Sequence, residues 1–232
     1  MLLTSRGIVL QSFKYGENSL ISKVVSRDRG VITLLSNKTK AKKNKQGNFF
    51  EPLSAIQFVC YISNKSDFHR VKEITYNNSI PLAPDSVTVH AVRFFLAEFL
   101  SKVIREQEQN FTLFDFIESR LSEMNTSPEI PSFFHIKFIT ELMDILGIQP
   151  YLNETDVYLD LQEGEGCFSR PTHSHFFNKQ EIELYLLGKN NPTILKKNER
   201  SLLLNLLLTY YDNQLGGIAN IKSKAVLEIV FE

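Results

Sequence analysis

The chain changes character once, around residues 80–86, and this change limits the folds that it can adopt. Before this segment, short apolar runs alternate with turn residues at roughly 8–12-residue spacing, which is typical of β-strands. After it, apolar residues recur at the spacing of one helix face. Two prolines interrupt strand pairing at the junction, and Asp85 or Ser86 can cap a helix. We therefore expect two domains, 1–80 and 81–232.

The first 80 residues predict a small closed β-barrel. Five short strands in this length fit the oligonucleotide-binding (OB) barrel, and an SH3-like barrel is the alternative. Gly30 provides a tight hairpin turn, because glycine adopts positive φ without strain. Cys60 lies in an apolar run and is expected in the core as a small hydrophobe. The expected strands are 7–14, 20–26, 31–36, 55–62 and 71–76.

The second half predicts a mainly helical domain, so the fold class is α+β. Residues 149–178 interrupt the helical pattern with a strand-like run and several glycines, and we expect a small irregular or β insertion there. The expected helices are 86–107, 112–124, 132–146, 179–187 and 199–214, with a last helix after Ser223.

A formal charge of zero hides two oppositely charged halves. Residues 1–80 carry 13 Lys/Arg against 5 Asp/Glu, whereas residues 81–232 carry 13 against 21. A flexible polar loop is expected between the third and fourth strands, and its lysines can follow a sugar-phosphate backbone as adaptable point charges. Nucleic acid is therefore the first partner to consider. The lysines of this loop are Lys38, Lys40, Lys42, Lys43 and Lys45.

Three aromatic residues lie close to these cations in the sequence, namely Tyr15, Phe49 and Phe50. Aromatic rings can stack on bases, but they are also common packing residues. Phe49 and Phe50, which precede a proline, are expected to pack.

Several function classes lack their sequence signatures. No phosphate-binding glycine loop and no nucleophile elbow occur. We expect no metal site, because the spacing of Cys167, His173 and His175 matches no common zinc pattern. The clustered carboxylates that a metal nuclease would need are expected to form a solvated acidic loop instead. These carboxylates are Asp156, Asp160, Glu163 and Glu165.

The chain has no apolar run long enough for a membrane helix and no evident secretory signal, so we expect a cytoplasmic protein. It has only two cysteines, Cys60 and Cys167, and both are expected to be reduced.

Several short motifs, in this order along the chain, resemble the bacterial recombination mediator family RecO. Each motif is degenerate, but together they extend over the whole sequence. They are Gly7-Ile8-Val9-Leu10, Tyr15-Gly16-Glu17-Asn18-Ser19-Leu20, Arg29-Gly30-Val31-Ile32, the lysine-rich loop, the helix from Phe138 to the stop at Leu146-Gly147-Ile148-Gln149-Pro150, and Lys222-Ser223-Lys224-Ala225-Val226-Leu227.

The resemblance implies an OB-fold domain followed by a helical domain. It also implies a non-enzymatic role in DNA repair, in which the protein binds single- and double-stranded DNA, anneals complementary strands and helps to load RecA onto DNA coated by single-strand-binding protein. The implied protein partners are RecR and the acidic C-terminal tail of single-strand-binding protein, and the implied location is the bacterial nucleoid. Many members carry a four-cysteine zinc site, but residues 151–177 contain Cys167 alone. We therefore expect neither zinc nor another cofactor.

The resemblance also assigns roles to individual residues. Contact with the phosphates of DNA is expected from Lys38, Lys40, Lys42, Lys43, Lys45, Arg27 and Arg29. Lys222 and Lys224 are candidates for contact with the tail of single-strand-binding protein.

Two other functions remain open from the residues themselves. OB barrels also hold RNA, and a lysine loop cannot sense the 2′-hydroxyl. Alternatively, the chain is a protein-interaction scaffold in which the helical half is functional and the basic loop is incidental.

Overall fold

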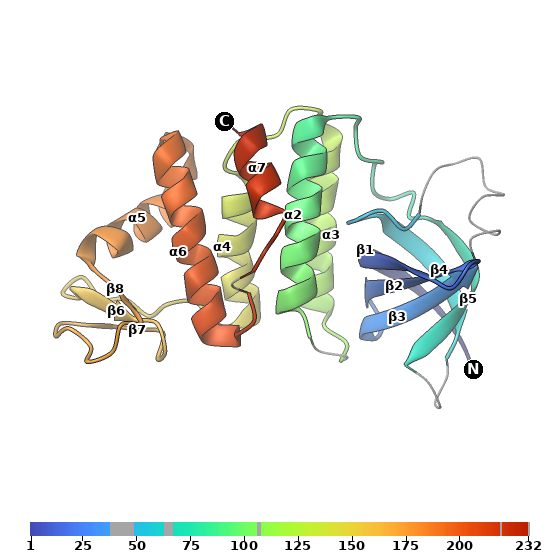
Figure 1. Ribbon diagram of the computed structural model, residues 1–232, viewed down its shortest axis with the longest axis horizontal. Helices are drawn as coiled ribbons and strands as arrows, with labels where there is room; N and C mark the ends of the chain where they lie inside the picture. The colour runs from blue at the N-terminus through green and yellow to red at the C-terminus, as the bar shows by residue number, and fades with distance from the viewer. Residues whose placement is uncertain (38–48, 63–66, 106–107, 219, 232) are drawn as a thin grey trace. The chain divides into compact units, whose positions relative to one another are not determined.

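The computed structural model describes residues 1–37, 49–62, 67–105, 108–218 and 220–231. The chain forms two compact units, Met1–Ile130 (unit 1) and Pro131–Glu232 (unit 2). Figure 1 shows a β-barrel with helices in unit 1, and helices with a small sheet in unit 2.

The five strands of unit 1 form a closed barrel in the order β1-β2-β3-β5-β4, in which only β3 and β5 pair in parallel. This confirms the predicted five-stranded OB-like barrel. Strands β1 and β5 begin earlier than the sequence pattern indicates, because Leu2 pairs with β4 and Phe68 pairs with β3. The strands are Leu2–Tyr15 (β1), Ser19–Ser26 (β2), Gly30–Asn37 (β3), Ala55–Tyr61 (β4) and Phe68–Tyr76 (β5).

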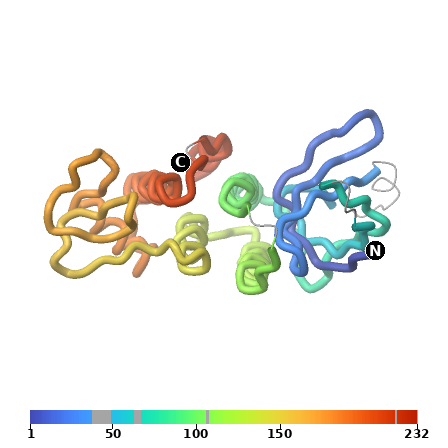
Figure 2. The backbone as a smooth tube through the Cα atoms, turned by 90° about the horizontal axis from the view of Figure 1, so that it is seen from below, coloured from blue at the N-terminus to red at the C-terminus, as the bar shows by residue number. Residues whose placement is uncertain are grey.

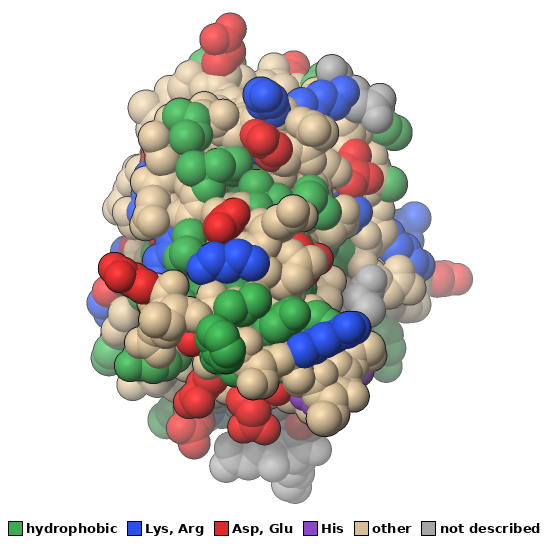
Figure 3. Space-filling view, turned by 90° about the vertical axis from the view of Figure 1, so that its left-hand side faces the viewer, with side chains coloured by type: hydrophobic (Ala, Val, Ile, Leu, Met, Phe, Trp, Pro, Cys, Tyr) green, Lys and Arg blue, Asp and Glu red, His purple; other side chains and the backbone are tan. Residues whose placement is uncertain are grey.

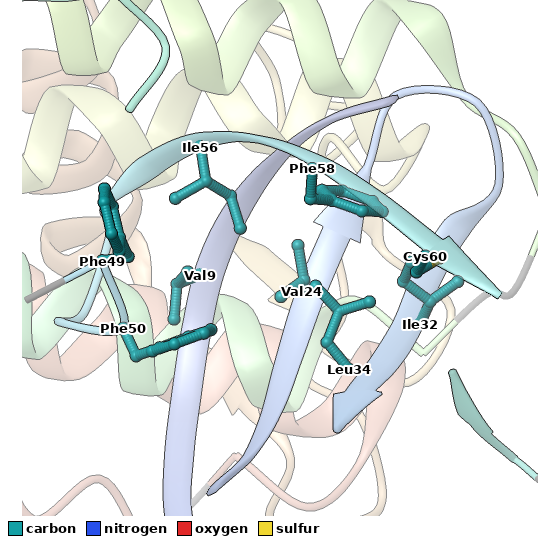
Figure 4. Close-up of a cluster of buried hydrophobic side chains, with 9 residues drawn as sticks. All are labelled: Val9, Val24, Ile32, Leu34, Phe49, Phe50, Ile56, Phe58 and Cys60. Carbon is teal, nitrogen blue, oxygen red and sulfur yellow. The ribbon is translucent and has the colours of Figure 1, made fainter. Parts of the chain in front are cut away.

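Alternate residues of the strands point inward and build the barrel core shown in Figure 4. Cys60 is fully buried there, and burial raises the pKa of its thiol to about 11. Phe49 and Phe50 are also buried, so they pack as predicted. The core residues are Val9, Val24, Ile32, Leu34, Phe49, Phe50, Ile56, Phe58 and Cys60. Gly7 lies against this core so closely that a Cβ atom there would meet the Phe58 ring at 2.9 Å.

A short segment that precedes β4 is held from two sides. The Leu53 amide donates a hydrogen bond of 2.7 Å to the Val9 carbonyl on β1. The Arg93 guanidinium, from helix α2, donates to the Pro52 carbonyl at 2.9 Å and to the Asn125 amide oxygen at 3.2 Å. Arg93 is only 5 % exposed, and burial lowers its pKa to about 10. The side chain therefore stays charged at neutral pH, and its hydrogen bonds offset the cost of burying that charge.

Helices α2 (Val87–Val103) and α3 (Phe111–Thr126) belong to unit 1 together with the barrel. Helix α2 contacts β1, and the Lys23 ammonium of β2 donates to the Ser101 carbonyl near the end of α2. Helix α3 is capped by Asn110, whose side chain accepts a hydrogen bond from the Leu113 amide. The boundary near residue 80 thus marks a change of secondary structure, whereas the compact units divide after Ile130; two domains with that boundary stay a prediction.

Unit 2 contains four helices within the described residues, and these confirm the predicted helical region. They are α4 (Phe134–Leu146), α5 (Lys179–Asn190), α6 (Lys197–Leu215) and α7 (Lys224–Val230). Helix α4 stops at Gly147, which has a φ of 68°. Two consecutive tyrosines of α6 bond to α4 and to the turn that follows it: Tyr211 donates to the Ile139 carbonyl in the middle of α4 at 2.7 Å, and Tyr210 to the Ile148 carbonyl after its end at 2.8 Å.

The segment between α4 and α5 forms a three-stranded sheet in the order β7-β6-β8, where a small β insertion was expected. Its strands are Tyr158–Asp160 (β6), Glu165–Cys167 (β7) and Phe176–Phe177 (β8). Figure 3 shows the end of unit 2 that carries this sheet and α5, where small apolar groups are separated by charged side chains. A search of the described residues finds no helix long and apolar enough to cross a membrane.

Candidate nucleic-acid interface

The five predicted phosphate-binding lysines lie outside the described residues. In the sequence they follow Asn37, the last residue of β3, and precede the buried Phe49. Their role in binding phosphate stays a prediction.

Arg27 is held by helix α3. Its Nε donates to the Asp115 carboxylate at 3.2 Å, and its guanidinium lies 4.6 Å from the centroid of the Phe111 ring. A phosphate that bound Arg27 would therefore compete with Asp115. Arg29, in the same turn, is exposed and makes no ion pair with any residue that the structure describes. Phosphate binding by both arginines remains a prediction.

A second barrel arginine is engaged in the same way. Arg6 Nη1 donates to both oxygens of Glu118 on α3, at 2.8 and 2.7 Å. The Asn77 amide donates to the same carboxylate at 3.0 Å, and the Arg6 guanidinium also lies 5.6 Å from the Phe114 ring centroid. Arg6 and Glu118 are 112 residues apart, so no local sequence pattern indicates this pair. Helix α3 thus pairs with two of the cations of the basic first 80 residues, Arg6 and Arg27.

Four cations in the described part of the barrel are exposed, together with aromatic side chains that sequence reasoning did not single out. Alternation on β1 could have indicated Phe13 as one of these aromatics. Its neighbour Ser12 is half-buried and hydrogen-bonds to Ser22, so Phe13 points to the opposite face of the sheet. The exposed cations are Lys14, Arg29, Arg70 and Lys72, and the newly found aromatics are Phe13, Tyr61 and Phe68.

Lys222 and Lys224 lie at the start of α7. Lys222 is exposed, whereas the Lys224 ammonium pairs with Glu228 one helical turn later at 2.9 Å. No observation tests their predicted role in partner binding.

Unit 2 contains a pocket of about 310 Å³ between α4, α6 and α7. Burial holds the pKa of His135 at about 3, and the nearby Arg200 charge adds to this effect. His135 is therefore neutral at physiological pH and stacks on Phe231 at a centroid distance of 5.5 Å. The pocket combines two cations with an apolar floor. Its lining residues are Ser132, His135, Lys197, Arg200, Ser201, Leu204, Leu227, Glu228 and Phe231.

The acidic residues of the insertion are used for local structure. Asp160 accepts a hydrogen bond from the Gln162 amide and pairs with His173 at 3.0 Å. The expectation of a solvated acidic loop is wrong for Asp156, which is buried and accepts from the Asn153 amide at 2.6 Å. The described part of the chain contains no group of three or more His, Cys, Asp or Glu arranged to hold a metal ion.

The fold and charge distribution define a class of protein in which a basic OB-like barrel precedes a helical region. Two family models match, described as the N-terminal region of recombination protein O over residues 1–79 and its C-terminal region over residues 90–225. The chain belongs to the RecO family.

Curated relatives match over the full length of both sequences. A DNA repair protein RecO from Azobacteroides pseudotrichonymphae is 30 % identical over 244 residues. Proteins with the same name from Flavobacterium psychrophilum and Bacteroides fragilis are each 28 % identical, over 239 and 242 residues.

Proposed function

We propose that this protein acts in DNA repair and homologous recombination as a mediator that binds DNA, anneals complementary strands and helps to load RecA onto DNA coated by single-strand-binding protein. Membership of the RecO family supports the DNA repair role. The DNA-binding and annealing roles are supported by the surplus of cations in residues 1–80, which contain 13 Lys/Arg and 5 Asp/Glu.

The mechanism requires no covalent step. Two DNA strands repel each other through their phosphates, and a cationic surface that contacts both lowers this repulsion while it releases condensed counterions. The cations proposed for this surface are the five loop lysines and Arg29, with Arg27 available only when Asp115 releases it. The contacts are to phosphates, so pairing between the strands supplies the sequence specificity.

We also propose that the acidic tail of single-strand-binding protein docks in the pocket of unit 2. Lys197 and Arg200 offer charges to its carboxylates, while Leu204, Leu227 and Phe231 offer apolar contact. This arrangement localises positive charge within a unit that is acidic in total. RecR is proposed as a further partner at the nucleoid, without an assigned contact site.

Strand annealing tests the DNA-binding proposal. Complementary oligonucleotides are annealed, bare and coated with the cognate single-strand-binding protein, across a range of salt. Substitution of the five loop lysines by glutamine should abolish salt-sensitive annealing, whereas substitution of the same lysines by arginine keeps the charge and should preserve annealing. A well-folded wild-type protein that neither binds nor anneals DNA at low salt would contradict the mediator role and favour the scaffold. Equal competition by matched RNA would favour the RNA-binding function.

Binding of the isolated tail peptide tests the pocket. Arg200→Gln should weaken binding by about tenfold, which is the loss expected when a charge-assisted hydrogen bond is removed. Lys189→Gln removes an equal charge from outside the pocket and should leave the affinity unchanged. Equal binding by both variants would exclude this pocket.

A further inference from the structure

We propose that the outer face of the barrel around Tyr15 and Phe68 is a platform on which unpaired DNA bases stack. The inference rests on the proposed DNA-binding function and assigns to it a preference for single strands. It is carried by the strand register, by the exposed aromatic rings and by the exposed Arg70 among them.

The hairpin of β1 and β2 extends past the closed part of the barrel, as Figure 2 shows. Strand β1 pairs with β4 only as far as Ile8, but it pairs with β2 as far as Tyr15. Strand β3 continues alongside β2 to its last residue, Asn37, which lies opposite Ser19. The outer part of the barrel is therefore a three-stranded antiparallel surface that ends at Tyr15, Ser19 and Asn37.

Apolar side chains follow one line across this surface, with Phe13 and Tyr61 exposed and Ile21 and Leu35 half-buried. Phe13 on β1 lies opposite Ile21 on β2, which lies opposite Leu35 on β3. The line continues over β5 at Arg70 to Tyr61 on β4. The neighbouring positions Ser22, Leu34 and Cys60 are buried, so alternation directs the residues of the line to the outside.

Two further rings meet on the same side of the barrel. Tyr15 and Phe68 are 6.2 Å apart between ring centroids, with an interplanar angle of 38°. Both rings remain substantially exposed although they contact each other. Such exposure is costly for an aromatic pair that serves packing alone, and contiguous exposed apolar groups commonly mark a binding surface.

One cation interrupts the aromatic surface. Arg70 lies within the line between Leu35 and Tyr61. Lys14 pairs with Leu20 and by alternation lies on the opposite face of the hairpin from Phe13 and Tyr15. Neither cation makes an ion pair within the described ranges. Asp67, Glu73 and Glu17 are the acids nearest in the sequence, and Glu73 pairs with Lys72 at 3.4 Å.

Exposed aromatic rings beside a cation fit a single strand better than a duplex or a protein. An unpaired base exposes both of its π-faces, whereas in a duplex they are covered by neighbouring bases. A phosphate next to these bases can pair with Arg70. A protein partner of this face would in contrast need a carboxylate placed opposite Arg70.

Comparing oligonucleotides with and without bases distinguishes the contribution of base stacking to binding from that of phosphate charge. Binding of an oligo-dT and of an abasic strand of equal length is compared for the wild type, Tyr15→Ala and Phe68→Ala. Each substitution should weaken oligo-dT binding by between about fivefold and about a hundredfold, the range for one stacked base, and should leave abasic binding unchanged. Tyr15→Phe should preserve the wild-type preference, because it keeps the ring.

Two controls define the charge and exposure effects. Phe94→Ala removes a ring with 53 % exposure from α2, matched to Tyr15 at 54 %, and should not change binding to either strand. Arg70→Gln should weaken binding to both strands alike and flatten the salt dependence.

The outcomes distinguish this proposal from the proposed function. If wild-type protein fails to bind either strand, the DNA-binding function itself is wrong. If it binds oligo-dT and Tyr15→Ala and Phe68→Ala bind equally well, the stacking platform is wrong and the DNA-binding function stands. If the two variants lose self-association but bind oligo-dT normally, the face is an interface between copies of the chain, which also overturns the platform.

Discussion

The two compact units of this chain differ in how they use their charges. Unit 1 has 17 Lys/Arg against 13 Asp/Glu, and unit 2 has 9 against 13. The excess of unit 1 is smaller than that of its first 80 residues, because α2, α3 and their connections bring acids to the barrel. Two of these acids, Asp115 and Glu118, pair with Arg27 and Arg6. The comparison teaches that part of the positive surface indicated by the sequence is neutralised inside the same unit.

The units also differ in the basic group that each one buries. Unit 1 buries Arg93, which keeps its charge and satisfies it with the Pro52 carbonyl and the Asn125 side chain. Unit 2 buries His135, which stays neutral. Arginine has too high a pKa to lose its proton on burial, whereas histidine loses its proton readily. The buried His135 should therefore make unit 2 sensitive to mild acid, whereas the buried Arg93 adds no such sensitivity to unit 1.

The largest expected effect is the loss of stability when a buried ring is removed from the core of one unit and not of the other. Phe58→Ala removes a ring that is 1 % exposed in the barrel and should lower the free energy of unfolding of the barrel by about 3–5 kcal/mol. Phe138→Ala should do the same to the core of unit 2. Hydrogen exchange at β4 and α4 measures the two losses. If each substitution increased hydrogen exchange equally in β4 and α4, the result would contradict the division into two units.

The next effect concerns the bidentate pair of unit 1. Glu118→Gln should destabilise unit 1 by about 2 kcal/mol, because it leaves the partly buried Arg6 without its ion-pair partner. The matched control is Glu123→Gln, which removes an exposed partner of Arg120 and should cost well under about 1 kcal/mol. Equilibrium denaturation measures both. Equal effects would show that α3 does not hold the barrel through this pair.

A comparable effect is expected in unit 2 at low pH. Because the folded pKa of His135 lies below the unfolded value of about 6.5, the unfolded state binds more protons between these values, and stability falls as the pH falls. The loss between pH 7 and pH 5 should be about 2 kcal/mol. Lys197, Arg200 and Glu228 also line the pocket, so the measurement compares wild type with His135→Phe. An unchanged pH slope in the variant would assign the acid sensitivity to another group.

The smallest expected effect tests Arg27, the other barrel arginine that pairs with α3. Asp115→Asn removes an exposed partner and should change stability by less than about 1 kcal/mol. It also frees Arg27, so binding of single-stranded DNA at low salt should become modestly tighter. Arg27→Gln in the same background should reverse this gain. No gain in Asp115→Asn would remove Arg27 from the set of phosphate contacts.

Much of the fold could be predicted from local sequence patterns. The expected helix 179–187 starts where α5 starts, because Asn178 and Glu181 form a capping box that is readable in the sequence. Helix α4 ends at Leu146 as expected, because Gly147 follows. Strand ends were less predictable: β1 gains residues 2–6 through pairing with β4, which depends on a partner about 50 residues away.

The candidate site was less accessible from the sequence than the fold. The clustered lysines are visible because they are neighbours in the chain. The engagement of Arg6 and Arg27 by α3 is invisible, because each pair joins residues that only folding brings together. The pocket of unit 2 is likewise built from three helices, and its cations Lys197 and Arg200 do not stand out from the other charged residues of α6.

The double attachment of the segment before β4 has a mechanical consequence. A pull on residues 49–53 would be shared between β1, through the Leu53–Val9 hydrogen bond, and α2, through the Arg93–Pro52 hydrogen bond. Two bonds loaded in parallel share the force, and both must break before the segment is released, so this point resists tension better than either bond would alone. A load applied to this segment would thus reach a helix as well as the barrel wall.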